Sequence, residues 1–141
     1  MACPYFYPTE RMIGRLWPHP ARLPLGDGHA GLCQADPGAE YRPGERAIAE
    51  WCNLGYARGQ CPRCPGGDGP DAVRFTVSGE GDGRVRIYWT REKDHRPGDH
   101  GPLEFDIALR SLVSPHPNLI LSRQAEAYAE SYLRRTGRSH D

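Results

Sequence analysis

Residues 52–65 read CNLGYARGQCPRCP and contain three of the five cysteines in this 141-residue chain. The other two, at positions 3 and 33, lie in turn-rich segments that can fold back onto this stretch. Closely spaced cysteines in a reducing compartment indicate metal binding or redox chemistry rather than structural disulfides. The candidate metal and cofactor ligands are therefore Cys3, Cys33, Cys52, Cys61 and Cys64, and we expect four of them to form one four-thiolate site.

The segment that leads into this stretch predicts a helix over residues 43–56. Pro43 suits a first helical position, and apolar residues recur at spacings of three and four along one stripe. The stripe consists of Ala47, Ile48, Trp51, Cys52 and Gly55. We expect Cys52 to point inward near the C-terminal end, and Gly55 or Gly59 to end the helix before the CPRCP sequence.

After a loop rich in glycine and proline, the apolar residues recur with a period of two, which predicts a β-hairpin. They are Val73, Phe75 and Val77 in the first strand and Val85, Ile87 and Trp89 in the second. Glycines in the connection over residues 79–83 supply the positive φ angles of a short turn. We expect a polar loop from Thr90 to Pro102 and a third strand over residues 103–107.

The last part of the chain predicts a second helix, capped by Asn118 or Ser114 and stopped by Gly137. Its apolar stripe consists of Leu121, Ala125, Tyr128 and Tyr132. Because a helix with one apolar stripe buries that stripe, we expect it to pack across one face of the hairpin.

These elements predict a small single α+β domain over residues 1–141. Residues 1–71 are expected to form a cysteine-bearing half that binds a metal or cluster, and residues 72–141 the hairpin and the C-terminal helix. Six of the 14 prolines fall within residues 1–40, which predicts an irregular but ordered wrap rich in proline and glycine. Glycines over residues 22–33 let the backbone approach a neighbour closely, and we expect that neighbour to be the metal site.

The charge balance and the apolar runs limit the function classes. Lys plus Arg and Asp plus Glu number 18 each, so bulk charge gives no reason to expect nucleic acid or an anionic membrane as partner. No apolar run has membrane-spanning length, and the N-terminal residues do not form a signal-peptide pattern. Nearly all basic residues are arginines, as in proteins from GC-rich bacteria. We therefore expect a cytoplasmic bacterial protein without a membrane partner.

The spacing of the cysteines favours an iron–sulfur cluster of the 4Fe-4S type over zinc. CPRCP is similar to half of a zinc ribbon, but proline replaces the glycine and no second pair follows. Intervals of 29, 18 and 8 residues from Cys3 to Cys61 suit a cluster wrapped by several loops. Zinc is the alternative, held by four cysteines or by three cysteines and a histidine such as His29 or His19.

Three segments, MACPYFYPTERM, RLPLGDGHAGLC and CNLGYARGQCP, carry a resemblance to a group of small bacterial cysteine-rich proteins. Members of that group are expected to bind iron–sulfur clusters, and no activity is defined for them. The resemblance extends loosely through the hairpin and the QAEAYAESYLRR helix. It implies a stand-alone domain of this architecture and assigns no catalytic residue.

Two further hypotheses concern a different kind of chemistry. CPRC resembles the CPxC of thioredoxin-like oxidoreductases, but there the motif follows a strand and opens a helix, whereas a helix precedes it here. A set of polar residues in and just after the expected loop could act as acids or bases or bind a second metal ion. A solvated loop is the simpler interpretation. Its members are Asp94, His95, Asp99, His100 and Glu104.

Nucleic-acid binding is the competing function from another class. The residues that suggest it share the outward face of the hairpin, where arginine holds phosphate and an aromatic ring stacks on a base. They are Arg74, Arg84, Arg86 and Tyr88. A solvated, arginine-rich sheet face explains the same pattern and is favoured.

A bound cluster is expected to have a structural, electron-transfer or redox-sensing role, with a redox or other protein as partner. Shielding by aromatic residues favours a structural role, and a ligand on a flexible arm such as Cys3 favours a labile sensor. The shielding aromatic residues would be Tyr5, Phe6, Trp17 and Trp51.

Overall fold

The computed structural model describes residues 2–12, 25–35, 41–56, 61–65 and 69–137. Its larger sheet is antiparallel, with strand order β3-β4-β5-β6. The strands are β3 (Ala72–Gly81), β4 (Arg84–Lys93), β5 (Arg96–Asp106) and β6 (Ser111–Leu112). The alternating apolar residues Val85 and Ile87 of β4 lie in the core and are fully buried. Asp82 and Gly83 form the turn between β3 and β4, with φ angles of 56° and 74°. The expected hairpin and third strand are confirmed.

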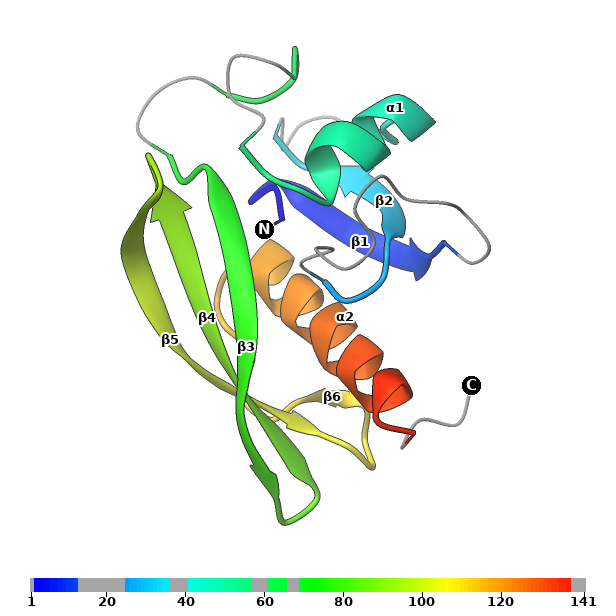
Figure 1. Ribbon diagram of the computed structural model, residues 1–141, viewed down its shortest axis with the longest axis vertical. Helices are drawn as coiled ribbons and strands as arrows, with labels where there is room; N and C mark the ends of the chain where they lie inside the picture. The colour runs from blue at the N-terminus through cyan, green and yellow to red at the C-terminus, as the bar shows by residue number, and fades with distance from the viewer. Residues whose placement is uncertain (1, 13–24, 36–40, 57–60, 66–68, 138–141) are drawn as a thin grey trace.

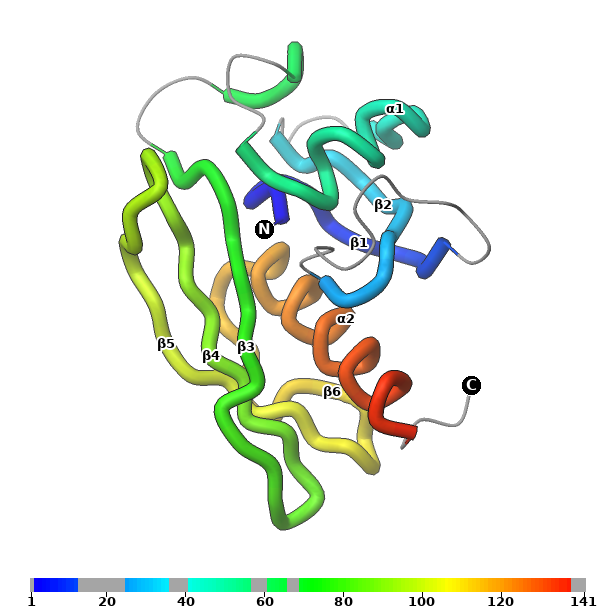
Figure 2. Tube along the Cα trace, in the orientation of Figure 1, coloured from blue at the N-terminus to red at the C-terminus, as the bar shows by residue number. Residues whose placement is uncertain are grey.

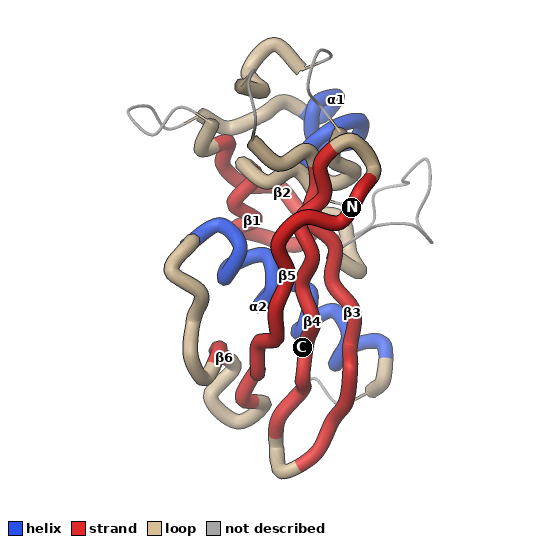
Figure 3. The backbone as a smooth tube through the Cα atoms, turned by 90° about the vertical axis from the view of Figure 1, so that its left-hand side faces the viewer, coloured by secondary structure: helices blue, strands red, loops and turns tan. Residues whose placement is uncertain are grey.

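Helix α2 (Leu119–Arg135) covers one face of this sheet, as Figures 1 and 3 show. The Asn118 side-chain oxygen accepts hydrogen bonds from the backbone N–H groups of Ile120 and Leu121, which caps the helix. Tyr128 stacks on Phe75 of β3, with ring centroids 5.5 Å apart. The predicted C-terminal helix, its cap and its packing face are therefore confirmed.

The second sheet is small and lies beside the N-terminal end of α2 (Figure 2). Strands β1 (Phe6–Arg11) and β2 (His29–Cys33) pair antiparallel, with Phe6 opposite Cys33. Two strands alone are marginally stable in water, so this sheet depends on its contacts with the rest of the domain. The expected wrap over residues 1–40 falls partly outside the described residues, and its described parts include these two strands.

The helix expected over residues 43–56 is shorter and of a different kind. An α-helical turn, α1 (Glu45–Ala47), leads into a π-helical turn, η2 (Ile48–Cys52). Gly55, with φ 77°, follows it, which confirms one of the two residues expected to end the helix. Ile48 and Cys52 are both buried, as the apolar stripe predicted.

The prediction of a polar loop from Thr90 to Pro102 is wrong. Strand β4 continues to Lys93 and β5 begins at Arg96, and only Asp94 and His95 form the turn, with φ angles of 52° and 61°. Polar side chains are compatible with this long hairpin because most of β5 in this part is exposed to solvent.

The N-terminal residues attach the small sheet to the larger one. Ala2 pairs with Val73 of β3 through two backbone hydrogen bonds of 2.7 and 2.8 Å. From α2, Arg123 Nε donates to the Pro8 carbonyl at 2.8 Å, and Arg134 forms an ion pair with Asp27 at 2.6 Å. These contacts fix the cysteine-bearing half against the helix. No described helix has the length and apolar character needed to cross a membrane.

Candidate functional site

All five cysteines line a single cavity of about 470 Å³. They reach it from four separate parts of the chain: the turn before β1, the end of β2, the end of η2 and the CPRCP segment. The remaining lining is largely apolar and aromatic and includes Tyr5, Phe6, Tyr41 and Trp51. The expectation that the distant cysteines fold back onto the CPRCP segment is confirmed.

Cys3 and Cys52 are joined directly through their backbones. The N–H of Cys3 donates to the Cys52 carbonyl at 3.1 Å. The Cys3 carbonyl in turn accepts hydrogen bonds from the backbone N–H of Phe6 at 3.1 Å and from Gln124 Nε2 at 2.8 Å. Cys3 is therefore held between η2 and α2.

Cys33 ends β2, and its N–H donates to the Tyr41 carbonyl at 2.8 Å. Asn53, fully buried next to Cys52, connects this strand to η2. Its side chain accepts from the His29 N–H and donates to the His29 carbonyl, both at 3.0 Å, and also donates to the Ile48 carbonyl at 3.0 Å. Asn53 thus fixes the segment carrying Cys52 relative to the strand carrying Cys33.

Cys61 and Cys64 belong to one turn, closed by a hydrogen bond of 3.1 Å from the Cys64 N–H to the Cys61 carbonyl. The Arg63 guanidinium lies 3.9 Å from the centre of the Tyr41 ring. Residues 61–65 contain neither helix nor strand, so within the described part of the chain this pair does not open a helix as in a thioredoxin-like site.

Burial and mutual proximity change the acidity of the inner thiols. Burial is the main cause that raises the pKa of Cys3 to about 12, and the thiols of Cys64, Cys33 and Cys61 add to it. Burial likewise raises the pKa of Cys52, with contributions from Cys3, Cys33 and Cys61. The thiols are close enough to influence one another, and without a cation the inner two are protonated at neutral pH.

No pair among the five cysteines forms a disulfide. Within the described ranges, no three His, Cys, Asp or Glu side chains are grouped tightly enough to hold a metal ion. The cysteines instead line a cavity of about 470 Å³. This volume is many times the roughly 30 Å³ that one water occupies in the liquid.

His29, one of the two histidines proposed as a fourth zinc ligand, does not line the cavity. His29 is buried elsewhere, and its Nδ1 lies 3.0 Å from the Asp27 carbonyl oxygen. His19 lies outside the described residues, as does Trp17 among the expected shielding aromatic residues. Gly31 of β2 also has another role than expected. A Cβ on Gly31 would overlap the Tyr7 carbonyl, so this glycine permits strand pairing rather than approach to a metal.

The polar residues of the β4–β5 region do not form one group. Asp94 and His95 lie at the turn, where the His95 ring stacks on Tyr56 at 4.2 Å between centroids. The Tyr56 hydroxyl donates to Glu92 at 2.6 Å, and burial followed by this carboxylate raises the pKa of Tyr56 to about 12. The other three members bond elsewhere: Asp99 to Arg91, His100 to Tyr88, and Glu104 to Arg84.

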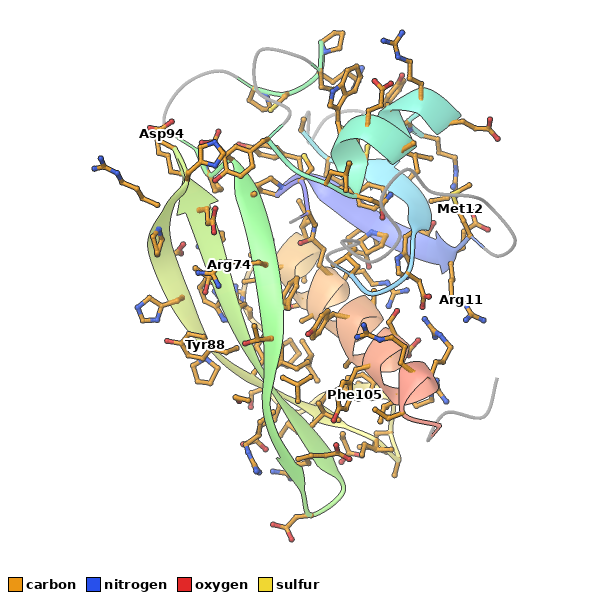
Figure 4. All side chains as sticks on the ribbon, in the orientation of Figure 1. Arg11, Met12, Arg74, Tyr88, Asp94 and Phe105 are labelled. Carbon is orange, nitrogen blue, oxygen red and sulfur yellow. The ribbon has the colours of Figure 1, made fainter. Side chains whose placement is uncertain are left out.

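The outward face of the sheet carries arginines, of which Arg74 and Arg84 are already paired. Arg74 and Tyr88 project from the side of the sheet away from α2, whereas Phe105 lies on the side that faces this helix, in the core (Figure 4). Arg74 forms an ion pair with Glu92 at 2.9 Å, and Arg84 with Glu104 at 3.1 Å. The Arg86 side chain lies against Gly79. Carboxylates therefore offset much of the positive charge on which phosphate binding would depend.

Three residues of the site escaped the sequence-based reasoning: Asn53, Gln124 and Tyr41. Each acts through contacts with a distant part of the chain, such as the bonds from Gln124 to the Cys3 and Phe6 carbonyls. A buried amide within a helical apolar stripe, as at Gln124, was the available signal. No family model, curated protein or solved structure matches this chain.

Proposed function

We propose that the protein binds an iron–sulfur cluster, of the 4Fe-4S type, through cysteine thiolates in the five-cysteine cavity. One observation carries the proposal: five thiol-bearing residues from four separate chain segments line one largely apolar cavity of about 470 Å³. Thiolates are the usual ligands of such clusters, and four are needed, so the cavity offers one more than the cluster requires.

Two properties of the cavity fit this group. Its volume and the apolar lining by Phe6, Trp51 and Tyr5 suit a cofactor larger than an ion. Arg63, which also lines it, has a buried Nε without a hydrogen-bond partner, and a sulfur acceptor would satisfy that donor. A bound cluster supplies one-electron redox chemistry, with a potential that depends on charge, hydrogen bonds and exposure.

Zinc remains the alternative occupant, because four thiolates are also its structural ligands. A zinc-stapled protein would be a binding module without redox chemistry, and nucleic acid would be a candidate partner through the arginine face. The paired state of Arg74 and Arg84 counts against that partner. A three-cysteine, one-histidine site receives no support from His29, which bonds outside the cavity.

The contacts of Cys3 favour a structural or electron-transfer role over labile sensing. This residue is the ligand nearest the N-terminus, yet its backbone bonds to Cys52, Phe6 and Gln124. A ligand held in three places does not dissociate as readily as one on a free arm. We further propose a cytoplasmic location, where thiols stay reduced, and a redox protein as partner.

Single Cys→Ser variants at all five positions test this proposal on anaerobically purified protein. We expect visible iron–sulfur absorbance to be lost in four variants and kept in the fifth. The variant that keeps it identifies the thiol that is not a ligand and serves as the internal control. Equal absorbance in all five variants, or none in the wild-type protein, would contradict the proposal.

A further inference from the structure

We propose that Arg63 is the counter-charge of the bound cluster and raises its reduction potential. This inference rests on the proposed function, since it names the residue that tunes the same site. It assigns a role to a side chain lying between Cys61 and Cys64 in the sequence that is not itself a ligand.

The position of Arg63 is the first observation. The residue lines the cysteine cavity, and its guanidinium lies over the Tyr41 ring at 3.9 Å. Tyr41 lines the same cavity and accepts the Cys33 N–H through its carbonyl, so its backbone is fixed relative to one cysteine. A cation over an aromatic face is attracted by the ring quadrupole, which holds the charge at the cavity wall.

The unsatisfied donor is the second observation. Arg63 Nε is buried and lacks a hydrogen-bond partner, and none of the described carboxylates lies within ion-pair distance of this side chain. Buried donors are rarely left unpaired in proteins. A thiolate or sulfide of an anionic cluster is a charged acceptor opposite in sign to this donor, and Arg63 lines the cavity that would hold it.

The consequence for redox chemistry follows from the charges. One-electron reduction adds one negative charge to a thiolate-bound cluster that is already anionic. A fixed cation and an N–H donor stabilise the reduced state more than the oxidised state, and both raise the potential. Removing them therefore lowers the potential without removing a ligand.

Arg46 provides the matched control. It lines the same cavity, but its Nε donates to Glu50 at 3.2 Å, so its charge is already paired on the surface of α1 and η2. Replacing it removes a cation of the same type from the same cavity without removing an unpaired donor. Because this charge is exposed and already paired, we expect R46Q to shift the potential much less than R63Q does.

The test compares wild-type protein with R63Q, R63K and R46Q, each purified anaerobically. Iron and sulfide content are measured first, followed by potentiometric titration with dithionite as reductant. For R63Q we expect the equilibrium constant of one-electron reduction to fall roughly tenfold, about 59 mV for one electron, as loss of one charge-assisted hydrogen bond implies. R63K keeps the positive charge but lacks Nε, so its reduction potential should lie between those of the wild-type protein and R63Q. Resonance Raman spectra should show shifted iron–sulfur stretching bands in R63Q and R63K, which both lack the Nε donor, and not in R46Q.

The outcomes separate this inference from the proposed function. R63Q with full iron and sulfide and an unchanged potential would overturn the role of Arg63 alone. Wild-type protein with zinc only, or without metal, would overturn the proposed function and this inference together. If R63Q assembles no cluster, the potential is measured in Tyr41→Leu instead. This variant keeps the Arg63 guanidinium but removes the ring that holds it at the cavity wall. A lowered potential in that variant supports the inference, and an unchanged one overturns it.

Discussion

Gln124 Nε2 donates a hydrogen bond of 2.8 Å to the carbonyl of Cys3, across 121 residues of sequence. The same nitrogen donates to the Phe6 carbonyl at 2.7 Å, and the Gln124 side chain has no exposure. One amide of the C-terminal helix therefore holds the turn that brings Cys3 to the cavity. The stability of the larger sheet and its helix is coupled in this way to the cysteine site.

Replacing Gln124 with leucine should destabilise the domain by about 1–3 kcal/mol, because buried carbonyls lose a donor that leucine does not replace. Urea unfolding measures the free energy, and alkylation of Cys3 should become faster. The control is Glu130→Gln on the same helix, whose carboxylate lies 3.8 Å from Arg110 in a partly exposed ion pair. That variant should lose less than about 1 kcal/mol. Equal stability of the Q124L and wild-type proteins would contradict the coupling.

A second prediction concerns Gly31 of β2, which lies opposite Pro8 of β1. A Cβ there would meet the Tyr7 carbonyl and would lie 2.9 Å from the Pro8 Cα. Gly31→Ala should therefore cost about 1–3 kcal/mol, as overpacking does, and should displace Cys33 two residues further along the strand. Gly81→Ala is the control, since a Cβ there meets nothing within 4 Å. If both variants unfold at the same urea concentration, the proposed steric limit at Gly31 is absent.

The third prediction is a pH dependence that originates at His29. Burial lowers the pKa of His29 to about 4, against 6.5 in the unfolded chain, and the charges of Arg123 and Arg134 act in the same direction. Between these values the unfolded state binds more protons than the folded state, so stability falls as the pH is lowered from about 6.5 to about 4. The loss should reach about 3 kcal/mol.

Urea unfolding at several pH values and NMR titration of the His29 ring measure this effect. The His29→Gln variant should lose most of the pH dependence in that window, whatever its overall stability. A ring that titrates near 6.5 in the folded protein would contradict the burial argument.

The elements with local signals were predictable from sequence. Strict alternation around Val85 and Ile87, with Asp82 and Gly83 at the turn, was enough to define the first hairpin. The start of α2 also had a local signal, because a cap acts on the next three residues; Asn118 is the cap of the two candidates, Asn118 and Ser114. The extension of β4 and β5 around Asp94 was not predictable, since pairing with the neighbouring strand, rather than an apolar pattern, decides it.

At the candidate site, it was predictable that the five cysteines lie together. The residues that hold these cysteines in place were not predictable. Cysteine spacing indicated a common site, and the cavity brings all five together. The position of Cys3 depends on Gln124, 121 residues away, and Cys33 bonds to Tyr41 of the next described segment. Such long-range hydrogen bonds have no periodic signature in one sequence.

The central claim is tested most directly by iron, acid-labile sulfide and zinc content in anaerobically purified wild-type protein. We expect about four irons and four sulfides per chain, with little zinc. One zinc and no sulfide would replace the cluster with a metal staple. Neither metal, in a chain that stays folded in chelator, would contradict the claim that the five-cysteine cavity is a cofactor site.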